Sequence, residues 1–134
     1  MSALSLPYRI VLGRRDLLPL CDVYLLGPKK RALVPALIDS GAMYSVFHVG
    51  AAEEAGLALS KAVESPVQFG GSISLGWRMR VYFVLEGRRL DTKVIFVEKL
   101  DFPYGLLGRR GVFGQFNEVV FLERIGTPRV ELRW

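Results

Sequence analysis

Short apolar runs separated by glycine-rich turns extend along almost the whole chain. Residues 20–26 form one such run, residues 27–30 turn the chain, and residues 32–38 return as a second run of strand length. Residues 77–85 alternate between apolar and polar side chains, which is the pattern of a strand with one buried face. A hairpin turn at residues 86–88 follows. Further strands are predicted at residues 8–12, 90–97, 117–122 and 129–134.

Helical patterns occur in two places. Residues 48–55 contain good helix formers, and Gly56 stands where a capping glycine is expected at a helix C-terminus. Residues 109–116 are a weaker candidate, because Gly111 and Gly114 interrupt the pattern. Many short strands with one clear helix predict an all-β fold, built as a small closed barrel with one or two short helices.

The composition is that of a folded globular protein. The chain has 134 residues, 51% of them hydrophobic and 23% charged, so we expect a single domain over residues 1–134. The longest stretches without a charged residue, 40–52 and 65–77, are too short to cross a bilayer, so no membrane partner is expected. The N-terminal segment lacks the basic and apolar regions of a secretory signal, which favours a cytoplasmic location.

Cysteine and histidine are too scarce for several common kinds of site. The chain has one cysteine, Cys21, and one histidine, His48, which excludes an intramolecular disulfide framework and the usual zinc sites. Nucleophilic catalysis by a Ser–His or Cys–His pair would have to use His48, which we expect near the surface at a helix start. We therefore predict no metal and no cofactor, and expect carboxylates to perform any catalysis.

The net charge of +5 raises the possibility of a nucleic-acid partner. The basic residues, however, occur in short clusters such as 29–31, 88–89 and 109–110, separated by predicted strands. We interpret them as solvated charges, mostly at turns, and a nucleic-acid-binding barrel is the disfavoured alternative.

The chemistry-bearing motif is Asp39-Ser40-Gly41-Ala42, which directly follows the apolar run 36–38. An aspartate at the end of an apolar strand is costly unless a partner solvates it or shares its charge. Downstream lies a second motif, Leu106-Leu107-Gly108-Arg109, an apolar pair closed by glycine. Between the two motifs, Phe69-Gly70-Gly71-Ser72 has the composition of a hairpin tip. In this order the three elements resemble the retropepsin-like aspartic proteases.

The resemblance covers most of the chain and implies the retropepsin barrel, with a role for each matching residue. Asp39 would be the catalytic aspartate, Ser40 would brace two active-site loops, and Gly41 would present its carbonyl group to substrate. Ala42 belongs to the same loop. Gly108 would let its strand pass close to the Asp39 loop, and Arg109 would be a structural arginine that starts a short helix. The hairpin of Phe69, Gly70, Gly71 and Ser72 would be the flap that closes over substrate.

The resemblance also implies how such a chain would act. Aspartic proteolysis needs two carboxylates and the sequence has one D-S-G motif, so the active form would be a homodimer with one Asp39 per subunit. A peptide or protein is the implied substrate. A non-catalytic dimeric peptide-binding module of the same fold is the alternative. Met43 departs from the family pattern, because many retroviral members have an acidic residue there, and Arg109 loses that charge partner.

Overall fold

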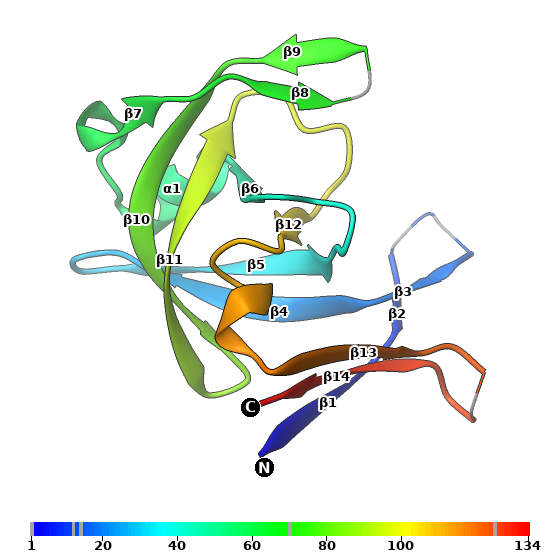
Figure 1. Cartoon of the computed structure of the whole chain (residues 1–134). Helices are drawn as coiled ribbons and strands as arrows, with labels where there is room; N and C mark the ends of the chain where they lie inside the picture. The colour runs from blue at the N-terminus through cyan, green and yellow to red at the C-terminus, as the bar shows by residue number, and fades with distance from the viewer. Residues whose placement is uncertain (1, 12, 14, 70, 125) are drawn as a thin grey trace.

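Six strands close into a barrel in the computed structural model, which describes residues 2–11, 13, 15–69, 71–124 and 126–134. Their order is β11-β6-β12-β5-β4-β10, and β10 pairs with β11 to complete the ring (Figure 1). A short strand, β7 (Val63–Glu64), extends the sheet beside β10. The barrel strands are β4 (Leu20–Leu26), β5 (Arg31–Ile38), β6 (Ser45–His48), β10 (Gly76–Leu85), β11 (Arg88–Val97) and β12 (Gly105–Leu107).

Two antiparallel hairpins supply four of these strands, and both were predicted from the apolar pattern. The strands β4 and β5 pair from Leu20 opposite Leu37 to Leu26 opposite Arg31. The strands β10 and β11 meet at a two-residue turn in which Glu86 and Gly87 have φ angles of 47° and 81°. Two successive residues with positive φ form the tight turn that matches the twist of the paired strands. The predicted all-β barrel is therefore confirmed.

The barrel interior is packed with apolar side chains. Phe47, Phe83 and Phe96 come from three different strands, are fully buried, and place the ring of Phe47 6.4 Å from each of the other two rings. Cys21 is also buried, as expected of a small apolar residue. A second, smaller apolar cluster, which includes Val46, Ile95 and Leu106, lies on the other side of these strands.

One of the two predicted helices forms. Helix α1 (Val49–Ala55) begins after His48, whose side chain accepts a hydrogen bond from the backbone N–H of Gly50, and ends at Gly56 with φ of 73°. The second prediction is wrong over most of its length. Residues 109–112 form a turn, and only a short 3₁₀ segment, η2 (Phe113–Gln115), follows. Another 3₁₀ turn, η1 (Leu59–Lys61), comes after α1.

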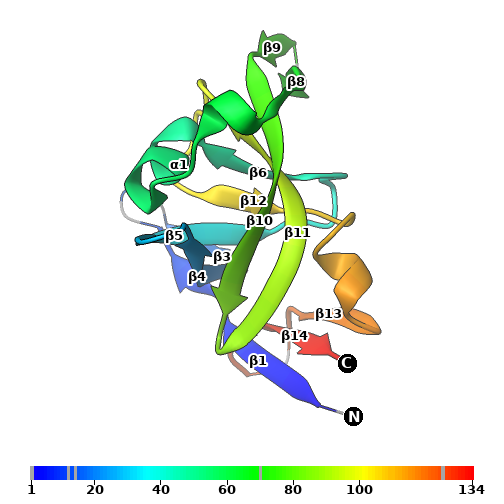
Figure 2. The ribbon, with the colours of Figure 1, turned by 90° about the vertical axis from the view of Figure 1, so that its left-hand side faces the viewer.

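A separate three-stranded sheet joins the two ends of the chain. Its order is β1 (Ala3–Pro7), β14 (Arg129–Arg133) and β13 (Glu118–Leu122), so the termini lie side by side (Figures 1 and 2). The strand β1 was not predicted. The C-terminal Trp134 is half-buried and packs against Phe116 and the Arg88 guanidinium. Since β14 has a partner on each side, it presents no free edge to a second chain.

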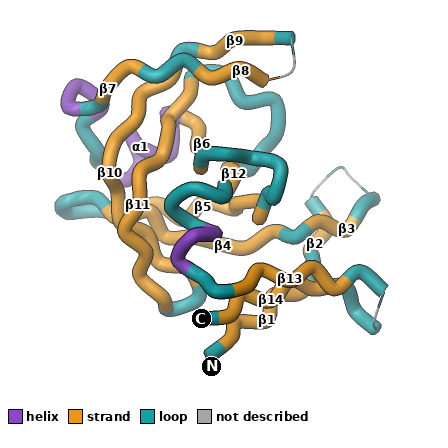
Figure 3. The backbone as a smooth tube through the Cα atoms, in the orientation of Figure 1, coloured by secondary structure: helices purple, strands orange, loops and turns teal. Residues whose placement is uncertain are grey.

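Two small hairpins project from the rest of the chain (Figure 3). One pairs β2 (Arg9–Ile10) with β3 (Leu17–Leu18), so the strand predicted at residues 8–12 is shorter than expected, and Leu12 lies outside the described residues. The other pairs β8 (Val67–Phe69) with β9 (Ser72–Ser74). Among the described residues, no helix is long and apolar enough to cross a membrane.

Candidate active site

Asp39 stands at the end of β5 and begins the loop 39–44. Its backbone N–H donates to the carbonyl of Leu107 on the parallel neighbour β12, at 3.0 Å. Its Oδ1 accepts from the N–H of Gly41 at 2.9 Å, and its carbonyl accepts from the N–H of Ala42 at 3.2 Å. These bonds form a tight turn that fixes the carboxylate. Within the described residues Oδ2 has no protein partner, so it is available to a substrate or a second carboxylate.

The loop 39–44 is held against the segment that follows β12. The N–H of Arg109 donates to the carbonyl of Ala42, and the N–H of Arg110 donates to the carbonyl of Met43, both at 2.9 Å. Gly108 donates its N–H to the buried Ser45 hydroxyl at 3.0 Å. A Cβ on Gly108 would lie 2.5 Å from the carbonyl carbon and oxygen of Tyr44, so only glycine allows this close approach. The structure thus brings together the two motifs that the sequence places far apart.

Two predicted site residues, Ser40 and Arg109, do not use their side chains to hold the loop 39–44 in place. Ser40 is exposed and makes no side-chain hydrogen bond, and Arg109 is exposed without an ion pair, among the residues that the structure describes. The lack of a charge partner for Arg109 agrees with the presence of Met43 in place of an acid. Moreover, Arg109 begins a turn instead of the predicted helix.

Arg110, which the sequence places only in a basic cluster interpreted as solvated charge, connects the loops instead. Its guanidinium lies 5.7 Å from the centre of the Tyr44 ring and donates to the Tyr44 hydroxyl at 3.4 Å. No local sequence signal identifies this pair, because it depends on how the loop 39–44 lies against residues 108–110.

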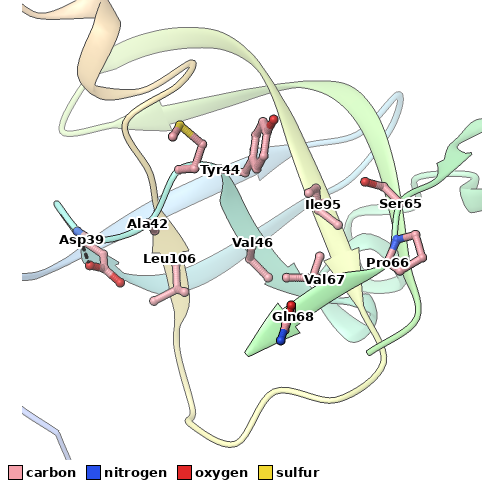
Figure 4. A pocket seen from close by; sticks show the side chains of 12 residues that line it. Asp39, Ala42, Tyr44, Val46, Ser65, Pro66, Val67, Gln68, Ile95 and Leu106 are labelled. Carbon is pink, nitrogen blue, oxygen red and sulfur yellow. Dashed lines mark hydrogen bonds between the residues drawn. The ribbon is translucent and has the colours of Figure 1, made fainter. Parts of the chain in front are cut away.

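A cavity of about 450 Å³ opens beside Asp39 (Figure 4). Asp39 lies at one end of it, Ser65 and Pro66 lie at the other, and Tyr44 forms part of the rim. Asp39 is the one charged side chain of the lining within the described residues. The walls are mainly apolar and include Val46, Val67, Ile95 and Leu106.

The β8–β9 hairpin lies over one side of this cavity, where the flap was predicted. Val67 and Gln68 of β8 line the cavity, and Phe69 pairs with Ser72 near the hairpin tip. Gly71 follows the tip with open space around it, whereas Gly70 lies outside the described residues. Ile73 on β9 is 73% exposed.

Solved structures resemble this arrangement over most of the chain. A retropepsin-like aspartic protease from Rickettsia conorii superimposes with a TM-score of 0.67 at 15% identity, covering 98% of this chain and 90% of that one. The chain has the retropepsin fold. The retroviral protease-like domain of Ddi1 from Leishmania major shares this retropepsin fold, with a TM-score of 0.60, 16% identity, and coverage of 83% and 84%.

A viral enzyme of the same fold is similar as well. The EIAV protease, solved with the inhibitor HBY-793, gives a TM-score of 0.53 at 16% identity, covering 75% of this chain and 88% of that protease. No protein-family model and no curated protein sequence matches the chain. The retropepsin fold is therefore recognised through backbone geometry, and the sequence resemblance is confined to short motifs.

Proposed function

We propose that this chain is a retropepsin-like domain that acts as an aspartic endopeptidase. The observation that carries the proposal is the placement of Asp39 at one end of an apolar cavity in the retropepsin fold. Backbone bonds hold it there, and its Oδ2 has no partner among the described residues. One carboxylate would take a proton from water as it attacks the peptide carbonyl, and a second would protonate the carbonyl oxygen. Transfer of a proton to the nitrogen then lets the C–N bond break.

The second carboxylate has to come from another copy of the chain. Asp39 is the single acidic side chain in the cavity lining, and the described residues hold no second carboxylate beside it. A two-fold axis next to the loop 39–44 would bring Asp39 of each subunit together. We therefore propose that the active form is a homodimer.

The free edge of β13 is the docking surface that fits such a dimer. Four of its five residues, 119–122, are apolar and half-buried, and β13 has no partner on its outer side among the described strands. The unpaired backbone groups of an edge strand are a template for pairing with another chain. The opposite edge of the sheet, β1, is less suitable because it contains Pro7. In Figure 2, β13, η2 and the loop between β5 and β6 lie along one side of the molecule.

The substrate in this proposal is an extended peptide. It would lie between the loop 39–44 and the β8–β9 hairpin, pairing with their backbones and inserting apolar side chains against Val46, Ile95 and Leu106. The exposed Ile73 is on the hairpin that would close over it.

Replacement of the proposed catalytic carboxylate tests this function. Asp39→Asn keeps the size and the acceptor oxygen of the side chain, so we expect the fold and the dimer to remain while cleavage of an unstructured peptide library, followed by mass spectrometry, is lost. Asp101→Asn is the matched control, since Asp101 is exposed and lies outside the cavity lining.

Two results would contradict the proposal in different ways. Equal cleavage by wild type and Asp39→Asn would remove Asp39 from the reaction. Peptide binding without cleavage by the wild-type dimer would favour the non-catalytic peptide-binding module. Two observations support that module: Arg109 has no ion pair among the described residues, and Met43 stands in place of an acid.

A further inference from the structure

Three cations lie beside residues that line the proposed substrate cavity, and we call them the cationic rim: Arg78, Lys93 and Arg110. Ile95 lines the cavity, and Arg78 lies directly opposite it across the β10–β11 pair, where side chains share a face. Lys93 precedes Ile95 by two residues and points to the same face of β11, about 7 Å away along the strand. Both basic residues are exposed.

Arg110 reaches the same border from a different element. Its guanidinium lies over the ring of Tyr44, which is part of the cavity lining. The parallel pairing of Val94 with Ser45 brings the start of β6 beside Lys93. The rim residues therefore come from three separate segments of the chain, next to the lining residues Ile95 and Tyr44.

No carboxylate neutralises the rim within the part of the chain that the structure describes. None of its members forms an ion pair. Asp91, two residues before Lys93 on the same face of β11, is hydrogen-bonded to Arg80, which lowers the pKa of Asp91. Glu64 pairs with Trp77, the residue before Arg78 on β10, so its side chain points to the opposite face of the sheet from Arg78. Asp101 does not line the cavity.

We infer that the cavity selects acidic peptides: chains with an apolar centre against the cavity walls and glutamate or aspartate side chains reaching the rim. This inference rests on the proposed peptide-cleaving function and adds its substrate class. Each acidic side chain of a peptide that meets an unpaired exposed cation raises the affinity of the peptide about two- to five-fold. Because the Debye length is about 8 Å at physiological salt, the preference is strongest at low ionic strength.

Peptides that differ only in their flanks test the inference. Each has the same central apolar pair, flanked by glutamates, glutamines or lysines, and cleavage by the wild-type chain gives kcat/KM at low and high salt. The rim variant is Arg78→Gln with Lys93→Gln. The matched control, Lys29→Gln with Lys30→Gln, removes the same charge from the exposed β4–β5 turn, which Figure 1 shows at the far end of the barrel.

We expect glutamate-flanked peptides to be cleaved with the highest kcat/KM, at least about five-fold above the glutamine series. The advantage should fall at high salt, shrink in the rim variant, and persist in the control. Equal kcat/KM for all flanks overturns the substrate class and leaves the proposed protease standing.

A binding measurement separates the inference from catalysis. Fluorescence polarisation with Asp39→Asn measures the affinity for labelled versions of the same peptides. If the wild type cleaves nothing but glutamate flanks still bind best, the proteolytic function fails and the acidic preference stands. Equal affinity for all flanks overturns the inference. So does a single-stranded oligonucleotide that binds at the rim without displacing the glutamate-flanked peptide, because that peptide then binds elsewhere.

Discussion

At the scale of single residues, the chain uses burial and local hydrogen bonds to determine which groups can react. Asp39 is half-buried at the mouth of a cavity, with one oxygen bound by its own turn and the other available. Cys21 has the opposite situation. It is buried between strands, with its Sγ donating to the carbonyl of Ala36 at 3.6 Å, and this burial raises the pKa of the thiol to about 12. The one cysteine is therefore structural, whereas the aspartate can react.

Burial of Cys21 predicts a loss of stability at alkaline pH. The unfolded thiol ionises near its ordinary pKa of 9, while the folded thiol stays protonated until pH about 12. The folded state therefore holds more protons between these values, so stability is full below pH 9 and falls as pH rises towards 12. The expected loss is roughly 1.4 kcal/mol per pH unit inside this window. Urea unfolding at several pH values measures it.

Cys21→Ala is the control for this prediction. The variant keeps Tyr8, whose own burial and hydrogen bond to Glu123 raise its pKa to about 12, so any alkaline effect of Tyr8 is common to both proteins. We expect the stability of Cys21→Ala to fall less steeply above pH 9. Parallel curves for the two proteins would show that the thiol does not contribute.

At the scale of elements, the local sequence pattern predicts an element correctly where that element is stabilised by its neighbours in the sequence. The hairpins β4–β5 and β10–β11 and the helix α1 follow from apolar periodicity, a tight turn and a capping glycine. The helix predicted at residues 109–116 does not form, because Gly111 adopts a φ of 84°, outside the helical range. Gly111 also lies close to Thr92, and a Cβ there would be 2.0 Å from the Thr92 hydroxyl oxygen. The strand β1 was missed because its partner, β14, lies at the other end of the chain.

The contact between the two motifs predicts a strong effect of one methyl group. Gly108→Ala would place Cβ 2.5 Å from the Tyr44 carbonyl, so the loop 39–44 has to move. We expect a loss of about 1–3 kcal/mol in the free energy of unfolding, together with loss of peptide cleavage. Gly114→Ala is the control, because its Cβ would meet only the Arg109 carbonyl, at 3.8 Å. Similar denaturation midpoints for the two variants would contradict a tight contact at Gly108.

At the scale of the whole molecule, the candidate site could be predicted only in part. The positions of Asp39 and Gly108 follow from motifs, but the contact of Arg110 with Tyr44 and the rim around the cavity depend on strand register. The structure places β14 between two partners and leaves β13 at the edge, because the N-terminal strand completes the sheet within the chain.

The edge of β13 yields a prediction about assembly. In a two-fold sheet formed by β13 from each subunit, Val120 at the middle of the strand faces its own copy, so Val120→Lys places two like charges opposite each other. We expect this variant to sediment as a monomer at concentrations where the wild type is a dimer, and to lose peptide cleavage in parallel. Ser5→Lys puts the same charge on the other outer strand, β1, and should leave both properties intact. If Ser5→Lys dissociates the dimer and Val120→Lys does not, the subunits meet at β1. The two copies of Asp39 would then need a different geometry to share a substrate.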